Sequence, residues 1–318
     1  MDTDLSDTSA ILLRGASTVG TFHSCIFRLN KTTVYGASLR VLEGAILNMF
    51  ACRFEDNQAG RGGAAVEGGF EDDDSFRGKL RFEDCIFERN HADDFSPAVD
   101  VSRLEELVLV RCEFVDNTSG AYGGAAYLYE CDGVLIQDCI FRNNRAEDSG
   151  GALVLELDDQ FEAVIEGCQF VGNHANGQGG ALTLEDNQHL VISDTIFDQN
   201  TAGEEGGAIH IDSDNGDSTI DLSGVICTNN RSDGSGGCLL VEAGNTVNVL
   251  SSATRKTSFD GNTALNGSDH VFLEGLRTNL PASVLDCSGA TSTTTTPLFT
   301  NPTPGIRSSP STEFNNTD

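Results

Sequence analysis

A short motif, Phe-x-x-Asn, recurs along most of this 318-residue chain. The copies lie at Phe27/Asn30, Phe54/Asn57, Phe87/Asn90, Phe114/Asn117, Phe141/Asn144, Phe170/Asn173, Phe197/Asn200 and Phe259/Asn262, and a degenerate copy places Cys227 before Asn230. Successive copies are 27 to 33 residues apart, and a spacing of 27 recurs four times. A repeat of roughly 20 to 50 residues is typical of solenoids, in which each unit buries its apolar face only against its neighbours.

Each repeat also carries strand signals. A Gly-Gly-Ala motif follows most of the asparagines, as in Gly150-Gly151-Ala152, and alternating apolar runs follow it at 152–156 and 163–170. Such alternation over about four to eight residues indicates β-strands, and no segment sustains the 3.6-residue period of a helix. We therefore predict an all-β protein, a right-handed parallel β-helix solenoid of about nine coils of roughly 27 residues. Each coil would contain three short strands and three turns.

Stacked coils place equivalent residues directly above one another, at the inter-strand spacing of about 4.8 Å. We expect the phenylalanines to stack inside the solenoid, and the asparagines to adopt the left-handed conformation at a turn and to bond to the next coil. The paired glycines would supply unusual backbone angles. The predicted structural ladder comprises Phe54, Phe87, Phe114, Phe141, Phe170, Phe197, Asn57, Asn90, Asn117, Asn144, Asn173, Asn200, Cys52, Cys85, Cys112, Cys139 and Cys168.

The cysteines of this ladder lie two residues before the phenylalanines, so they should face the interior with them. Cys25 occupies the same place in the first repeat. Stacked Cβ atoms about 4.8 Å apart lie slightly beyond the range that favours a disulfide. We predict buried free thiols in this column. Cys131, Cys238 and Cys287 fall outside it, so a disulfide involving them stays open.

Composition divides the chain into three parts. Residues 1–10 are predicted to form a frayed N-terminus and residues 11–287 the solenoid, followed by a disordered Ser/Thr/Pro-rich tail at 288–318. No signal peptide is recognisable in the acidic first residues, so either the protein is not secreted by that route or the sequence is a segment of a longer chain. The linker-like tail favours the second alternative. No run of about 18 apolar residues occurs, so we expect no direct membrane insertion.

Acidic residues gather in the turns that follow the first strand of several coils. The candidates for weak Ca²⁺ sites are Asp158, Asp159, Glu185, Asp186, Asp212, Asp214 and Asp217. Stacked turns would bring such oxygen ligands together, as Ca²⁺ requires. The alternative, which we favour, is a solvated edge that keeps rods apart. We therefore expect no obligatory cofactor.

The net charge of the chain argues against some classes of binding partner. The formal net charge is −30, which opposes binding to nucleic acid and to anionic polysaccharides. An enzyme acting on polysaccharides is the main rival interpretation, because such enzymes use paired carboxylates. Trp is absent and only 4 Tyr occur, which leaves few residues to stack on sugars. The histidines form no HxH or HExxH grouping, so a zinc site is not expected.

The paired motifs carry a family resemblance. Phe-x-x-Asn together with Gly-Gly-Ala-(Ile/Leu/Val), as in Gly180-Ala181-Leu182 and Gly207-Ala208-Ile209, resembles the passenger region of the chlamydial polymorphic outer membrane proteins. The resemblance covers Phe27 to Asn262 and implies a cell-surface or extracellular β-helix used in adhesion, but it carries no catalytic residues. We expect a non-catalytic scaffold that binds a macromolecule or glycan on a host or neighbouring cell. The alternatives are a pectin-lyase-like enzyme and an architectural rod that associates end to end.

Overall fold

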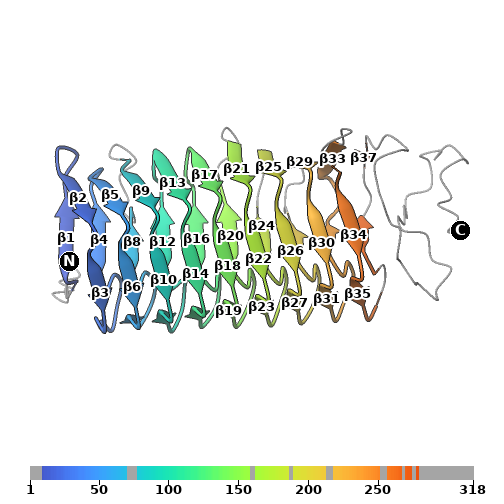
Figure 1. The fold of residues 1–318 in the computed structure, drawn as a ribbon, viewed down its shortest axis with the longest axis horizontal. Helices are drawn as coiled ribbons and strands as arrows, with labels where there is room; N and C mark the ends of the chain where they lie inside the picture. Colours follow the sequence, from blue (N-terminus) through green and yellow to red (C-terminus); the bar gives the residue numbers. More distant parts are fainter. Residues whose placement is uncertain are drawn as a thin grey trace, which may run out of the picture.

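The computed structural model describes residues 9–69, 77–157, 162–185, 189–212, 218–250, 256–266, 269–273 and 277–278. These residues form strands joined by turns, and no helix occurs among them. The chain winds into a rod whose coils stack along the long axis (Figure 1). The predicted all-β parallel solenoid is confirmed. Most of the predicted N-terminal segment, Cys287 and the predicted tail at 288–318 lie outside the described residues.

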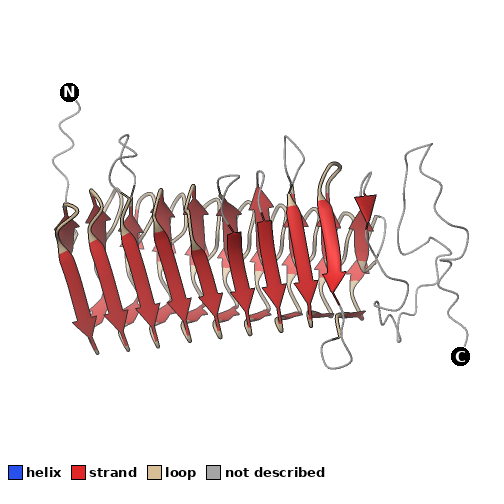
Figure 2. Ribbon diagram, turned by 90° about the horizontal axis from the view of Figure 1, so that it is seen from above, coloured by secondary structure: helices blue, strands red, loops and turns tan. Residues whose placement is uncertain are grey.

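Four parallel sheets run the length of the rod, and Figure 2 shows their strands side by side. Sheet A contains β1 (Ile11–Arg14), β4 (Leu39–Leu42), β8 (Val66–Gly68), β12 (Val99–Ser102), β16 (Ala126–Tyr129), β20 (Leu153–Glu156), β24 (Leu182–Glu185), β28 (Ile209–Ile211), β32 (Leu239–Val241) and β36 (Val271–Leu273). Sheet B contains β2 (Val19–His23), β5 (Ile46–Phe50), β9 (Lys79–Glu83), β13 (Glu106–Val110), β17 (Val134–Gln137), β21 (Glu162–Glu166), β25 (His189–Ser193), β29 (Thr219–Ser223), β33 (Thr246–Leu250) and β37 (Arg277–Thr278).

The other two sheets consist of shorter strands. Sheet C contains β3 (Ile26–Arg28), β6 (Arg53–Glu55), β10 (Ile86–Glu88), β14 (Glu113–Val115), β18 (Ile140–Arg142), β22 (Gln169–Val171), β26 (Ile196–Asp198), β30 (Ile226–Thr228) and β34 (Ser258–Asp260). Sheet D contains β7 (Gln58–Ala59), β11 (His91–Ala92), β15 (Thr118–Ser119), β19 (Arg145–Ala146), β23 (His174–Ala175), β27 (Thr201–Ala202), β31 (Arg231–Ser232) and β35 (Thr263–Ala264). The prediction of three strands per coil is therefore wrong by one, because two residues after each ladder Asn also pair between coils.

Phenylalanines form a continuous stack inside the solenoid. The rings of Phe114 and Phe141 are 4.6 Å apart between centroids, and so are those of Phe141 and Phe170. Their planes are nearly parallel, because strict strand register leaves each ring directly above its equivalent. The six predicted ladder phenylalanines are fully buried, which confirms their interior position.

The ladder asparagines are buried and bonded between coils, as predicted. The side-chain amide of Asn173 donates to the Phe141 carbonyl oxygen and to Asn200 Oδ1, both at 3.0 Å. Its own Oδ1 accepts hydrogen bonds from the backbone and the side chain of Asn144. The expected left-handed backbone is wrong for the ladder asparagines, because the residue before each one takes that conformation, as Gln199 does with φ of 56°. This turn directs the Asn side chain inward.

The cysteine column is also as predicted among the described residues. Cys52, Cys85, Cys112, Cys139 and Cys168 are buried free thiols, and the equivalent Cys25 is half-buried. The backbone N–H of Cys112 donates to Cys139 Sγ at 3.4 Å, so the thiols accept bonds from the coil below. Burial raises the pKa of the Cys52 thiol above its usual value, which favours the neutral form.

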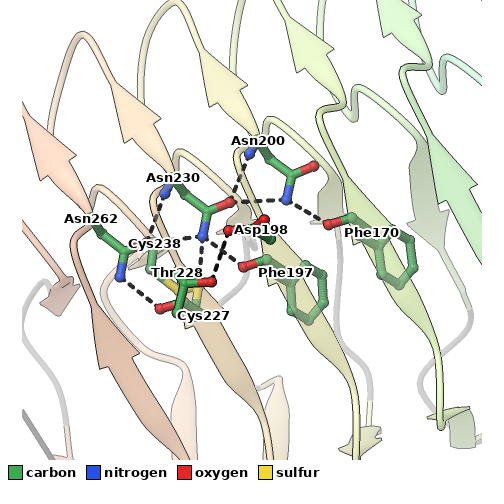
Figure 3. The surroundings of a disulfide bond; sticks show 9 residues. All are labelled: Phe170, Phe197, Asp198, Asn200, Cys227, Thr228, Asn230, Cys238 and Asn262. Atoms are coloured by element: carbon green, nitrogen blue, oxygen red, sulfur yellow. Dashed lines mark hydrogen bonds between the residues drawn. A yellow bond between two sulfur atoms is a disulfide. The ribbon is translucent and has the colours of Figure 1, made fainter.

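One coil departs from the pattern through a disulfide. Cys227 takes the place of a stacked phenylalanine between Phe197 and Phe259, and it bonds to Cys238 (Figure 3). The two Cα atoms are 6.2 Å apart. Cys238 stands where the previous coil has Ala208. In other coils, a Phe ring and a small Ala of the same coil fill this interior volume. The disulfide therefore takes the place of these two side chains.

The paired glycines are required by close backbone contact. From Gly123 onward, the first of each pair, such as Gly179 with φ of 61°, has the left-handed conformation that a side chain strains. The second, such as Gly180, has a normal φ, but a Cβ there would overlap the Gly207 carbonyl oxygen of the next coil. The two glycines therefore allow the turn between sheets D and A to lie directly against the backbone of the next coil.

Candidate functional site

The outer face of sheet A carries different side chains in successive coils. In β24, Leu182 and Leu184 point into the core, while Thr183 points away from it and is buried all the same. The preceding glycine turn covers this second position, since a Cβ at Gly179 would overlap the Thr183 hydroxyl. The fourth position, two residues further on, faces the same side and is only half-buried at Glu185. Ligands can therefore approach this face along its fourth-position residues.

Four acidic residues occupy that fourth position in successive coils, and we call them the acidic column: Glu156, Glu185, Asp212 and Glu242. Glu156 pairs directly with Glu185. The column continues because the backbone N–H of Asp212 bonds to the Leu184 oxygen at 2.9 Å, and that of Glu242 bonds to the Ile211 oxygen at 2.9 Å. In-register stacking thus aligns like charges at about 4.8 Å.

Four aromatic residues, the aromatic patch, adjoin the acidic column: Phe95, Tyr122, Tyr127 and Tyr129. The ring centroids of Phe95 and Tyr127 are 5.7 Å apart, and those of Tyr127 and Tyr129 are 6.5 Å apart. The Tyr127 hydroxyl donates to Glu156 Oε2 at 2.5 Å, which joins the patch to the column. All four side chains are partly exposed. This surface combines flat apolar rings with hydrogen-bond acceptors.

Nearby carboxylates and burial raise the pKa values of the three tyrosines of the patch. The negative charge of Asp148 raises the pKa of Tyr122. A hydrogen bond with Glu130 raises the pKa of Tyr129 to about 12. Burial raises the pKa of Tyr127 well above its usual range, and the bond to Glu156 adds to this. The patch therefore offers neutral phenol groups at physiological pH.

The aromatic patch was not predicted from the sequence. The chain has only 4 Tyr, which argued against stacking on sugars, yet the fold brings three of them together with Phe95. Tyr122 comes from the turn before β16, and Tyr127 and Tyr129 come from the strand itself. The spacing of Tyr127 and Tyr129, two apart in an alternating run, was the one available signal that they share a face.

The predicted Ca²⁺ candidates divide into two groups. Glu185 and Asp212 lie in the acidic column, one coil apart. The others, Asp158, Asp159, Asp186, Asp214 and Asp217, lie outside the described residues. No arrangement of oxygen ligands typical of Ca²⁺ can be assigned to Glu185 and Asp212 alone.

A different cluster of potential metal ligands occurs on the same face. Glu205, His210 and Glu242 each place one ligand atom within 4.8 Å of the others. His210 occupies the covered second position of β28, and its Nε2 is 3.5 Å from Glu242 Oε1. The sequence expectation against a zinc site was based on the absence of HxH and HExxH groupings, whereas this cluster joins residues of separate segments. The signal was absent from the sequence because Glu242 comes from the next coil.

Within the described part of the chain, no helix is long and apolar enough to cross a bilayer.

Comparison with curated proteins and with solved structures gives no match. A family model described as a right-handed β-helix region matches residues 10–276. This range spans nearly all of the coils described above, and its hand agrees with the predicted fold. The chain therefore belongs to the right-handed β-helix family.

Proposed function

We propose that this protein is a non-catalytic binding scaffold, at the cell surface or outside the cell, that engages a glycan on a host or neighbouring cell. The observation that carries the proposal is the aromatic patch beside the acidic column on the outer face of sheet A. Tyrosine rings can stack on the apolar faces of sugars. Carboxylates accept hydrogen bonds from sugar hydroxyls or amines.

The negative charge of the chain excludes some chemical classes of glycan. The net charge of −30 and the acidic column both repel a polyanion. Neutral glycans, and glycans with free amino groups, do not meet this repulsion. The repeated spacing of the column, about 4.8 Å per coil, suits a chain lying along the rod axis.

Two observations support a location outside the cytosol. The Cys227–Cys238 disulfide is of the kind that persists in oxidising compartments. The resemblance to the chlamydial polymorphic outer membrane proteins points to adhesion at a cell surface. Neither observation depends on the glycan proposal.

The test is glycan-array screening of the full chain, followed by calorimetric titration of the best neutral or amino-sugar oligosaccharide. The double variant Tyr122→Ala/Tyr129→Ala should weaken binding by about tenfold or more, since each aromatic contact contributes about 0.5–1.5 kcal/mol. Tyr35→Ala is the matched control, because Tyr35 lies outside the patch and contacts Arg61. Equal loss in both variants, or no glycan bound at all, would refute the proposal. A chain that binds no glycan but polymerises end to end would support the architectural rod.

A polysaccharide-active enzyme is the second candidate. The observation that favours it is the contact between the Glu242 carboxylate and the buried His210 imidazole, whose Oε1 and Nε2 are 3.5 Å apart. A carboxylate that orients an imidazole is a pairing used in acid–base chemistry. The measurement is product release from the glycan identified on the array. Release that disappears in Glu242→Gln would assign catalysis, and unaltered glycan would support the scaffold.

A further inference from the structure

His210 is an unusual occupant of its position. It lies at the second position of β28, where neighbouring coils have Thr183 and Leu240. The side chain is 0% exposed, and neither ring nitrogen makes a hydrogen bond. A buried imidazole without hydrogen bonds is destabilising, because its ring nitrogens have lost their bonds to water and gained none in the protein. The column itself accepts Leu240, so packing alone does not require a histidine.

The unbonded imidazole faces two carboxylates. Glu205 belongs to the glycine turn that covers His210, and Glu242 follows β32 on the next coil. One ligand atom from each of the three residues lies within 4.8 Å of the other two. The separation of His210 Nε2 from Glu242 Oε1 is 3.5 Å, which is an ion-pair contact and too long for a hydrogen bond. The edge of a tetrahedron of zinc ligands is similar, about 3.4 Å for bonds of about 2.1 Å.

We propose that Glu205, His210 and Glu242 bind a divalent transition metal ion, of which Zn²⁺ fits best. One imidazole and two carboxylates are ligands that Zn²⁺ accepts in tetrahedral sites. Ca²⁺ and Mg²⁺ prefer oxygen ligands alone, so the imidazole selects against them. Two carboxylates balance the charge of the ion. Three protein ligands leave a fourth position for water or for a bound molecule.

The proposal explains why three unlike residues meet at one place. A metal ion would satisfy a nitrogen of the buried imidazole, which the protein alone leaves unbonded. It would also cross-link the turn before β28 to the strand end after β32, and so join two coils. The acidic column adds Asp212 beside Glu242, which increases the attraction for a cation. The inference does not depend on glycan binding.

The experiment uses the full chain, stripped with EDTA and dialysed into buffer with 150 mM NaCl, on the order of physiological ionic strength so that surface charges are screened. Titration with ZnCl₂ should show one site per chain that binds at least about 100-fold more tightly than CaCl₂. CoCl₂ should produce visible absorption bands of tetrahedral or five-coordinate Co²⁺. Zn²⁺ should also raise the melting temperature.

Three variants distinguish the residues that coordinate the metal ion from a nearby acidic residue that does not. His210→Leu places in β28 the residue that the next coil already has at Leu240, so it should fold, and Glu242→Gln keeps the shape of the third ligand. Each should abolish the Co²⁺ bands and weaken Zn²⁺ binding at least about 100-fold. Glu185→Gln, in the acidic column but outside the cluster, is the matched control and should bind Zn²⁺ as the wild type does.

Two results would overturn the proposal. The first is Zn²⁺ affinity that is unchanged in His210→Leu or Glu242→Gln, which would mean that exposed carboxylates bind the ion adventitiously. The second is no Zn²⁺ binding by the EDTA-stripped wild type. Loss of stability that is equal with and without EDTA when the His210–Glu242 pair is removed would then assign a plain ion pair. If His210→Leu does not fold, Glu242→Gln and the NMR shift of the His210 ring nitrogens on adding Zn²⁺ decide.

Discussion

At the scale of single residues, the fold depends on side chains whose bonding runs from coil to coil. Asn173 is fully buried, yet every polar atom of its side chain has a partner in an adjacent coil or in Phe141. Asp100 is the opposite case. It is fully buried on the outer face of sheet A, and neither of its oxygens has a hydrogen bond. Asn173 therefore stabilises the solenoid, whereas Asp100 destabilises it locally.

Asn173→Ala should lower the free energy of unfolding by about 3 kcal/mol, because it removes the buried hydrogen bonds that its side chain makes with the Asn144 backbone N–H, the Asn144 side-chain amide and the Phe141 carbonyl oxygen. Asn176→Ala is the matched control, since Asn176 is exposed and its loss should change stability by no more than about 0.5 kcal/mol. Urea denaturation followed by circular dichroism measures both. Equal midpoints for the two variants would contradict a stabilising role for the asparagine column.

Asp100→Asn should stabilise the protein at neutral pH and have little effect near pH 4. Burial raises the pKa of Asp100 well above its usual value, and the charges of Glu67 and Asp94 raise it further. Below about pH 4 the carboxyl is protonated in the folded and unfolded chains alike, so it adds no penalty. As pH rises towards the folded pKa, the penalty grows by up to about 1.4 kcal/mol per pH unit. Melting temperatures from pH 4 to 8 measure this, and a gain independent of pH would contradict the account.

At the scale of the element, the coil is the repeating structural unit. Its core side chains can be exchanged for others when together they fill the same interior volume. The eighth Phe-x-x-Asn repeat shows this most clearly, because the Cys227–Cys238 disulfide replaces the usual pairing of a Phe with a small residue. Asn230 still bonds to Asn262 and to the Phe197 carbonyl oxygen around it (Figure 3). The asparagine column therefore continues past a change in the phenylalanine column.

The double variant Cys227→Phe/Cys238→Ala should fold and keep most of the wild-type stability, because it restores the residues that other coils use. Cys238→Ala alone should be less stable than the oxidised wild type by about 3 kcal/mol, since it removes the cross-link and leaves unfilled volume. Thermal unfolding with and without reductant checks this. If the double variant is less stable than Cys238→Ala, the coil does not accept a Phe at this position.

At the scale of the whole molecule, the rod is a one-dimensional stack in which each strand pairs only with the equivalent strands of the neighbouring coils. The strand order in each sheet follows the chain order of the coils from end to end. Stability is then approximately a sum of coil and interface contributions. The length of the rod should therefore be adjustable in whole coils and in no smaller step.

Deletion of residues 145–173, one complete coil, should leave a folded solenoid. Asn144 and Asn173 are equivalent ladder positions 29 residues apart, so the cut joins matching points and keeps every remaining column in register. The rod should shorten by about 4.8 Å. Small-angle scattering and circular dichroism measure the length and the strand content.

The matched control is a deletion of residues 145–158, which removes only half of a coil. It places core residues on the solvent face and should prevent cooperative folding. If both deletions unfold the protein, or if both fold equally well, the coil is not the structural unit.

The sequence by itself determined the solenoid and its interior columns. The spacing of Phe114, Phe141 and Phe170 predicted rings that stack, because parallel coils must align equivalent residues. The buried thiols and the bonds between ladder asparagines followed from the same alignment. The sequence did not reveal the fourth strand of each coil, since a two-residue pairing leaves no periodic signal.

Only the tertiary structure decided the outer face of sheet A. Tyr122 and Tyr127 meet there from a turn and a strand, and Glu205 likewise comes from a turn to lie near His210 and the Glu242 of the next coil. These residues differ in type from one coil to the next, so no repeat marks them. Their distances depend on how the glycine turn lies over the strand and on which coils become neighbours. The repeat encodes what successive coils share, and the surface chemistry lies in the residues by which they differ.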